Sequence, residues 1–178
     1  MNLDIANETC LASIAALASE CITHMRRLGI EQWDELYPTI DTFRQDCAGG
    51  HLLVLRDDKG VIGSATLDDH QPSEYRAIHW EFLAGPVGVV HRLMIAPPCM
   101  GKGLAKLLMA GVEEQAYLRG YRVLRLDAFL KNPPALRLYA GLGYRRAGNV
   151  DFRKGPIACF EKELRTTTAA SKTSNDAV

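Results

Sequence analysis

The 178-residue sequence predicts an α/β protein with a mixed β-sheet of about six or seven strands, flanked by about four helices. Two observations predict this fold class. Short runs rich in valine, isoleucine and leucine alternate with segments whose apolar residues recur at helical spacing. In mid-chain, a strand, a helix and a strand follow one another, which implies a parallel pair joined by a crossover. Closely connected strands at both ends imply antiparallel pairs, so the sheet is expected to be mixed.

The N-terminal half is expected to contain a strand, two helices and a hairpin, at residues 2–6, 7–29, 39–47, and 51–56 with 61–67. Asn7 is a suitable helix N-cap, and Gly29 and Gly49 are natural helix stops. The sequence Asp57-Asp58-Lys59-Gly60 between the last two strands is typical of a hairpin turn.

The C-terminal half is expected to contain four strands and two helices, at residues 87–95, 104–120, 122–127, 132–142, 144–150 and 157–164. Asn132 caps the second helix, with prolines in its first turn. The less regular stretch 68–86 precedes these elements, and loops of that length are usually functional or mobile. Residues 1–165 form the expected domain, and the small polar residues 166–178 predict a flexible tail.

Composition excludes several classes of protein. Basic and acidic residues number 21 each, so the chain lacks the overall positive charge of a nucleic-acid binder. The five cysteines form no CxxC pair and no Cys/His spacing suited to zinc, which argues against a disulfide framework or a metal site. No apolar run is long enough to span a membrane and no signal peptide is visible, so a cytoplasmic protein without membrane or nucleic-acid partners is expected.

The most informative segment is Met100-Gly101-Lys102-Gly103-Leu104-Ala105, between an apolar strand and an amphipathic helix. Its glycines allow close approach of a ligand, and the helix start offers free N–H groups, so the segment suits a phosphate or pyrophosphate. A Walker A loop is excluded because Gly103 follows Lys102 where serine or threonine is required. A dinucleotide fingerprint fits weakly, because Lys106 holds its third glycine position.

The same segment resembles the acyl-coenzyme A loop of the GNAT superfamily of N-acetyltransferases, Q/R-x-x-G-x-G/A, at every position but the first, where Met100 stands. Residues 93–97, LMIAP, resemble the strand that leads into this loop in the family. The stretch 132–144, NPPALRLYAGLGY, resembles the second family motif, N-x-x-A-x-x-L-Y-x-x-L-G-F/Y. The resemblance extends over residues 1–164, including the expected order of elements.

The resemblance implies an acetyl-CoA-dependent N-acetyltransferase that uses no metal and acts by direct transfer to a primary amine of a small molecule or protein. It implies a sheet whose fourth and fifth strands splay apart to hold the pantetheine. The coenzyme-binding residues that it implies are Leu93, Met94, Ile95, Met100, Gly101, Lys102, Gly103, Leu104, Ala105, Asn132 and Tyr139. A homodimer is compatible with the family. The alternative function is a catalytically degenerate acyl-CoA-binding or sensor module, which the unusual Met100 favours.

Direct transfer requires a group that accepts a proton from the amine and one that protonates the leaving sulfur. Tyr139 matches the family tyrosine that serves as the acid, or it merely packs beneath its helix. His91 is a candidate base, because period-2 alternation puts it on the same strand face as Ile95, or it is a structural histidine. Glu81 is a second candidate base, or a solvated loop residue.

Other residues have both a functional and a structural interpretation. Trp33, Tyr37, Tyr75, Trp80 and Phe82 either shape an acceptor pocket or pack in the core. Cys99, beside a helix start, is a remote candidate for a covalent acyl-enzyme. The three arginines 119, 122 and 125 either meet an outer phosphate of the coenzyme or are solvated. The identity of the acceptor does not follow from the sequence.

Overall fold

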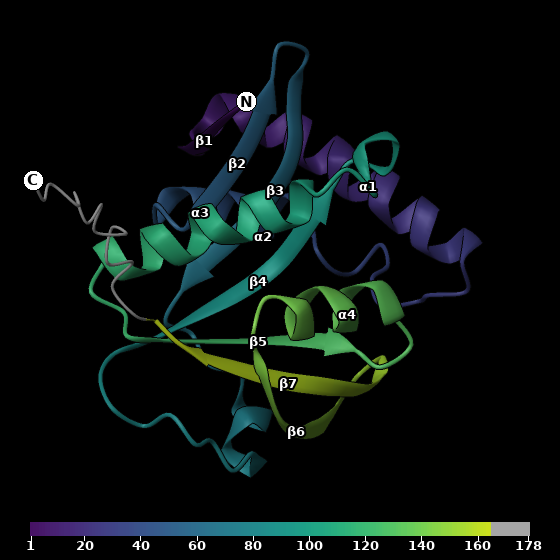
Figure 1. Ribbon diagram of the computed structural model, residues 1–178. Helices are drawn as coiled ribbons and strands as arrows, with labels where there is room; N and C mark the ends of the chain where they lie inside the picture. Colours follow the sequence, from purple (N-terminus) through teal and green to yellow (C-terminus); the bar gives the residue numbers. More distant parts are fainter. Residues whose placement is uncertain (165–178) are drawn as a thin grey trace, which may run out of the picture.

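The computed structural model describes residues 1–164, which form one seven-stranded sheet in the order β1-β2-β3-β4-β5-β7-β6 (Figure 1). The strands are β1 (Asn2–Ile5), β2 (Leu52–Asp57), β3 (Gly60–Asp68), β4 (Val87–Ile95), β5 (Val123–Phe129), β6 (Arg145–Phe152) and β7 (Gly155–Glu163). The helices are α1 (Leu11–Arg27), α2 (Ile40–Ala48), α3 (Leu104–Leu118) and α4 (Pro133–Gly141), with 3₁₀ turns η1 (Glu8–Cys10), η2 (Ser73–Ala77) and η3 (Pro97–Cys99).

The predicted mixed α/β fold is confirmed. Each expected strand and helix is present, the β4–β5 pair is parallel and the other pairs are antiparallel. Asn7 does act as a cap, but of η1, where its side chain accepts a hydrogen bond from the Thr9 N–H. The predicted tail 166–178 lies outside the described residues. No helix within residues 1–164 has both the length and the hydropathy needed to cross a bilayer.

Helices cover both faces of the sheet (Figure 1). Alternate residues of β2 face opposite layers: Leu53 and Leu55 pack in the cluster that includes α3, whereas Leu52 and Val54 pack in the cluster that includes α1 and α2. This is the period-2 pattern of a strand buried on both faces, and it explains why β2 is a continuous apolar run.

Strands β4 and β5 splay apart after a short parallel contact. Their pairing extends only from Val87–Val90 on β4 to Val123–Leu126 on β5. Beyond it, the remainder of β4 pairs only with β3, and residues 127–129 of β5 pair only with β7. The expected splay is therefore present, and it leaves a gap in the sheet at the carboxyl ends of two parallel strands, where ligands characteristically bind in α/β sheets.

A β-bulge interrupts β4 at this same point. Thr66 pairs with His91 and Ser64 pairs with Met94, so one residue of β3 stands opposite two of β4. Arg92 in the bulge has a φ of 52°, a left-handed conformation that non-glycine residues seldom adopt. The bulge changes the alternation of side chains along β4, which matters for the placement of His91.

Candidate active site

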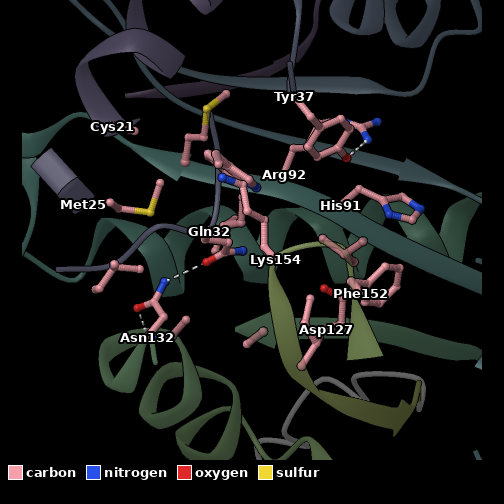
Figure 2. Close-up of a pocket in the computed structure, with 18 of the residues that line it drawn as sticks. Cys21, Met25, Gln32, Tyr37, His91, Arg92, Asp127, Asn132, Phe152 and Lys154 are labelled. Carbon is pink, nitrogen blue, oxygen red and sulfur yellow. Dashed lines mark hydrogen bonds between the residues drawn. The ribbon is translucent and has the colours of Figure 1, made fainter. Parts of the chain in front are cut away.

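A cavity of about 1000 Å³ occupies the gap between β4 and β5 (Figure 2). Its walls come from the ends of β4 and β5, from α1 and the loop after it, from α4, and from the turn between β6 and β7. Of the catalytic and coenzyme-binding residues predicted from sequence, those that line it are His91, Leu93, Met94, Ile95, Met100, Asn132 and Tyr139. The structure therefore brings together residues that lie up to 48 positions apart in the sequence.

The glycine loop adjoins this cavity through Met100, which is partly exposed. Gly101 and Gly103 have φ values of 76° and 77°, and a Cβ added at either would meet no atom within 4 Å. Within residues 1–164, the N–H groups of residues 101–105 have no hydrogen-bond acceptor in the protein. These donors, at the start of the 15-residue helix α3, suit the pyrophosphate of coenzyme A.

Lys102 does not point its ammonium group into the cavity. Its Nζ donates to the carbonyl oxygen of Pro98 at 2.9 Å, within the same loop. Lys102, Leu104 and Ala105 are not among the residues that line the cavity. Their expected part in coenzyme binding thus depends on the main-chain N–H groups of the loop.

Asn132 has two tasks at the start of α4. Its Oδ1 accepts from the Ala135 N–H at 3.3 Å and so caps the helix, as expected from the sequence. Its Nδ2 donates to Oε1 of Gln32 at 3.1 Å, across the cavity (Figure 2). This second bond ties α4 to the loop after α1, and it could not be foreseen because the two residues are 100 positions apart.

Tyr139 is buried on α4, where its ring packs against those of Tyr144 and Phe160. Its hydroxyl group has no hydrogen-bond partner within residues 1–164, although the residue lines the cavity. Burial, followed by the nearby charge of Asp127, raises the pKa of the Tyr139 hydroxyl above its ordinary value of 10.0. At neutral pH the group is therefore protonated and able to donate.

His91 lines the cavity, but not for the reason given by simple alternation. Val90 and Ile95 pack in the same cluster although they are five positions apart, because the bulge at Arg92 shifts the parity of β4. By this parity His91 and Ile95 do not share a face, which corrects the expectation from sequence.

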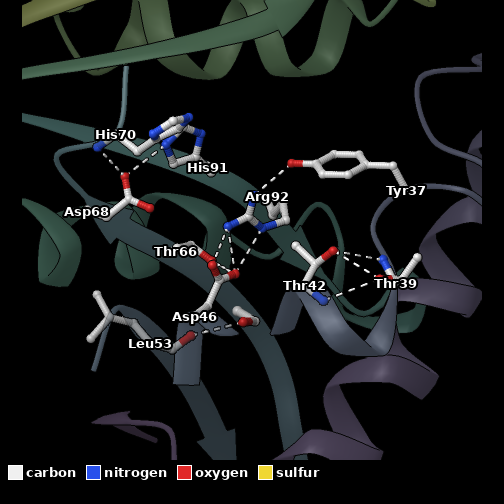
Figure 3. Close-up of polar contacts among 11 residues, drawn as sticks. Tyr37, Thr39, Thr42, Asp46, Leu53, Thr66, Asp68, His70, His91 and Arg92 are labelled. Atoms are coloured by element: carbon white, nitrogen blue, oxygen red, sulfur yellow. Dashed lines mark hydrogen bonds and ion pairs between the residues drawn. The ribbon is translucent and has the colours of Figure 1, made fainter. Parts of the chain in front are cut away.

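A carboxylate holds the His91 ring in place (Figure 3). His91 Nε2 lies 3.1 Å from Oδ1 of Asp68, which also accepts from the N–H of His70. Burial opposes the ionisation of Asp68, but the hydrogen bond and charge of His91 outweigh it, so the pKa of Asp68 lies below its ordinary value. Asp68 is therefore ionised at neutral pH and keeps the His91 ring in a fixed position at the cavity wall.

Glu81 lies outside the cavity. It forms an ion pair of 2.7 Å with Arg145 on β6, and its side chain is 58% exposed. Its N–H donates to Glu161, a fully buried carboxylate of β7. The structure thus ties Glu81 to β6 and β7, and Glu81 does not line the cavity that Tyr139 and His91 share.

The aromatic residues expected near an acceptor divide into two groups. Trp33 and Tyr37 line the cavity, whereas Tyr75 and Trp80 pack against each other in the core at 5.2 Å between ring centroids. Phe82 and Cys99 are absent from the cavity lining as well.

The three arginines near the proposed coenzyme site are held by the protein itself. The guanidinium of Arg119 donates to two main-chain carbonyl oxygens. Arg122 lies over Tyr117, and Arg125 is buried over Trp80. None of the three lines the cavity; Arg122 is exposed, as the solvated alternative expects, whereas Arg125 is buried.

Asp127 is a site residue that sequence reasoning missed. It follows the last residue of β5 that pairs with β4, so it lies at the splay, and it lines the cavity (Figure 2). Its Oδ2 accepts from the Tyr75 hydroxyl at 2.9 Å. Burial raises the pKa of Asp127 above its ordinary value of 3.8, although the Tyr75 hydrogen bond and His91 counteract it. The available signal was a carboxylate at the carboxyl end of a parallel strand.

A second missed feature is the buried ion pair of Arg92 and Asp46 (Figure 3). Two guanidinium nitrogens of Arg92 bond to the Asp46 carboxylate, at 2.6 to 3.1 Å. The third donates to the Tyr37 hydroxyl at 2.7 Å, and Thr66 donates to Asp46 at 2.9 Å. This network anchors the left-handed residue of the bulge to α2, so it stabilises the shape of β4 at the splay.

Comparisons with known proteins agree with this architecture. The model of the acetyltransferase (GNAT) family matches residues 14–144. The chain is 27% identical over 146 residues to an S-(2-succino)cysteine N-acetyltransferase of Bacillus subtilis, covering 79% of this chain and 82% of that protein.

Two solved structures share the fold. A GNAT-family acetyltransferase of Streptococcus agalactiae superposes with a TM-score of 0.83, at 24% identity over 92% of this chain and 95% of the other. A Salmonella typhimurium protein solved with its cofactor acetyl-CoA superposes with a TM-score of 0.69, at 18% identity over 97% and 98% of the two chains.

Proposed function

Since the chain belongs to the acetyltransferase (GNAT) family of N-acetyltransferases, we propose that it transfers an acetyl group from acetyl-CoA to the primary amine of a small molecule. The observation that carries this proposal is the continuity between two features. Unpaired N–H groups at residues 101–105 begin beside a cavity that is lined both by the partly buried carboxyl group of Asp127 and by the buried Tyr139, whose hydroxyl has no partner in the described part of the protein. One site thereby offers donors for an anionic coenzyme and two groups that can transfer protons.

The acetyl-CoA thioester supplies the activated acyl group. The amine forms a bond to the acyl carbon as the carbon–sulfur bond breaks. We assign the proton of the amine to Asp127 and the proton for the leaving sulfur to Tyr139. The raised pKa of Asp127 makes it a stronger base than an ordinary carboxylate, and the raised pKa of Tyr139 keeps its proton in place until the sulfur leaves.

His91 is the alternative proton acceptor, positioned by Asp68. Asp127 is preferred because of its burial at the splay, where its charge also affects Tyr139. Both groups are compatible with a direct transfer.

A small molecule is favoured as the acceptor because ion pairs close the cavity at the turn between β6 and β7. Asp34, in the loop after α1, forms ion pairs with Arg153 and Lys154 in the turn between β6 and β7. A protein loop would have to displace this bridge. The Bacillus subtilis relative, named for acetylation of S-(2-succino)cysteine, supports an amine of amino-acid type.

The test combines binding with turnover. Acetyl-CoA affinity is measured by calorimetry, and release of the coenzyme thiol is followed with a panel of small amines and, separately, lysine-containing peptides. Turnover with a small amine, lost in Asp127→Asn and retained in His91→Ala, supports the proposal. Acetyl-CoA binding without thiol release on any amine would instead identify an acyl-CoA-binding module, and turnover on peptides alone would exclude the small-molecule acceptor.

A further inference from the structure

The two ends of the cavity are lined by groups of opposite charge. At the splay it is lined by the carboxyl groups of Asp127, the proposed base, and of Asp68, which contacts His91. At its other end, in the turn between β6 and β7, it is lined by the cations Arg153 and Lys154. An amine carries a positive charge before it reacts, so the splay suits its nitrogen and the turn suits a negative group.

The two cations share a single carboxylate. Arg153 Nη2 lies 2.9 Å and Lys154 Nζ 2.6 Å from Oδ2 of Asp34. The hydrogen bonds from Lys154 and then Arg153 outweigh burial and lower the pKa of Asp34, so this residue is ionised at neutral pH. One negative charge against two positive charges leaves a formal charge of +1 at this end of the cavity.

The remaining cation that lines the cavity is not available to a ligand in the same way. All three guanidinium nitrogens of Arg92 are engaged, by Asp46 and by the Tyr37 hydroxyl, and Asp46 balances its charge. The unbalanced positive charge therefore belongs to the turn. The side chains of Arg153 and Lys154 are 56% and 25% exposed, so both have surface left for another partner.

The positive end is far from the reacting end. Asp127 pairs with Cys159 on β7, and Lys154 precedes Cys159 by five residues. At about 3.3 Å per residue this is about 17 Å along the strand, which the reach of the lysine side chain shortens only in part. In an α-amino acid the nitrogen and the carboxyl carbon are roughly 2.5 Å apart. The α-carboxylate of an acceptor whose amine reacts at the splay thus does not reach the turn.

The wall between the two ends is apolar. Phe152 and Ile157 of the β6–β7 hairpin line it, and Met25 of α1 faces the same cavity (Figure 2). A ligand that extends from the splay to the turn would therefore place carbon or thioether atoms along this stretch.

We propose that the acceptor is an amine with a carboxylate several bonds away from its nitrogen, and that Lys154 and Arg153 bind this remote carboxylate. The inference rests on the proposed N-acetyltransferase function and adds the class of its acceptor. Asp34 acts as a positioning residue, which holds the two cations over the cavity in the absence of the ligand.

The test compares acceptors that differ only in the remote group: S-(2-carboxyethyl)-L-cysteine and its side-chain carboxamide. The wild-type enzyme is expected to favour the carboxylate by about tenfold to hundredfold in kcat/KM, the range for a hydrogen-bonded charged pair. The double variant Arg153→Gln/Lys154→Gln is expected to bring this ratio close to one. Lys59→Gln, which removes an exposed cation from the β2–β3 turn, should leave the ratio at its wild-type value.

Two further measurements keep the outcomes separate. Asp34→Asn leaves both cations without their carboxylate, so the preference should persist or increase. Calorimetric binding of the carboxylate ligand to the wild type and the double variant tests the subsite without turnover. Turnover with an equal rate for the two acceptors, or an unchanged ratio in the double variant, would overturn the inference while the proposed function stands. Absence of turnover with every amine would refute the proposed function, and the calorimetric comparison would still decide the subsite.

Discussion

Replacement of Asp127 by asparagine is the sharpest test of the site, because activity and stability should change in opposite directions. In the wild type the Tyr75 hydroxyl donates to Asp127 Oδ2 at 2.9 Å, and asparagine retains an oxygen that can accept this bond. The asparagine side chain has no charge, however, and its oxygen is a much weaker base than a carboxylate. As the proton acceptor is lost, kcat should fall by about 10²-fold to 10⁴-fold, the usual contribution of a general base.

The stability change follows from the direction of the pKa shift. The pKa of Asp127 is higher in the folded protein than its ordinary value of 3.8, mainly because of burial. Folding therefore favours the protonated form, and this group reduces stability progressively as pH rises from 3.8 through its folded pKa. Each unit of that difference corresponds to about 1.4 kcal/mol, so Asp127→Asn should unfold at higher urea concentration than the wild type at pH 7.5.

The assay is urea unfolding at pH 7.5 and at pH 3.5, alongside thiol release with acetyl-CoA. The stabilisation should be present at the higher pH and should disappear at the lower one, where both the folded and the unfolded wild type are largely protonated. Asp151→Asn, at an exposed position on β6, is the matched control and should change neither quantity. Asp127→Asn with undiminished activity, or with reduced stability at pH 7.5, would refute the assignment of Asp127 as a buried base.

Four further changes have defined outcomes. Tyr75→Phe removes a hydrogen bond that lowers the pKa of Asp127, so the acid side of the pH–rate profile should move to higher pH. Tyr139→Phe should preserve acetyl-CoA affinity and lower kcat by about 10²-fold, whereas an unchanged kcat would leave the residue a packing role only. Gly103→Ala puts a side chain at φ 77°, which costs about 1–2 kcal/mol, and should raise KM for acetyl-CoA without a change in acceptor KM. Asp46→Ala leaves a buried guanidinium without its partner and should lower the free energy of unfolding by about 3–5 kcal/mol in urea titrations.

Local sequence patterns were sufficient for the helices and strands and for the glycine loop before α3. The Asp57–Gly60 turn does join β2 to β3, with Asp57 Oδ1 accepting from the N–H groups of Lys59 and Gly60. The glycine pair before an amphipathic helix indicated a loop that a ligand can approach closely, and Gly101 and Gly103 indeed have no atom within 4 Å of an added Cβ. These features depend on residues within one turn of each other, so a single sequence contains the information that determines them.

Alternation failed where the backbone departed from regular geometry. Period-2 alternation predicts that His91 shares a strand face with Ile95, and the bulge at Arg92 removes the regular alternation on which this prediction depends. The bulge itself is held by Asp46, which is 46 positions away, so no local pattern announces it. Glu81 shows the same limit: its position relative to the cavity was determined by Arg145 and Glu161, on strands that follow it by more than 60 residues.

The sequence by itself thus determined the fold class, the order of the elements and a loop suited to an anionic coenzyme, because hydrophobic periodicity and turn chemistry act over short distances. Only the tertiary structure decided which polar groups share the cavity. Asp127 is a candidate base because folding buries it at the splay. Asp34 meets Arg153 and Lys154 at the end of the cavity although about 120 residues separate them in the sequence. Burial and proximity between residues distant in sequence arise only when the chain folds, and they determine which polar residues can act together in the cavity.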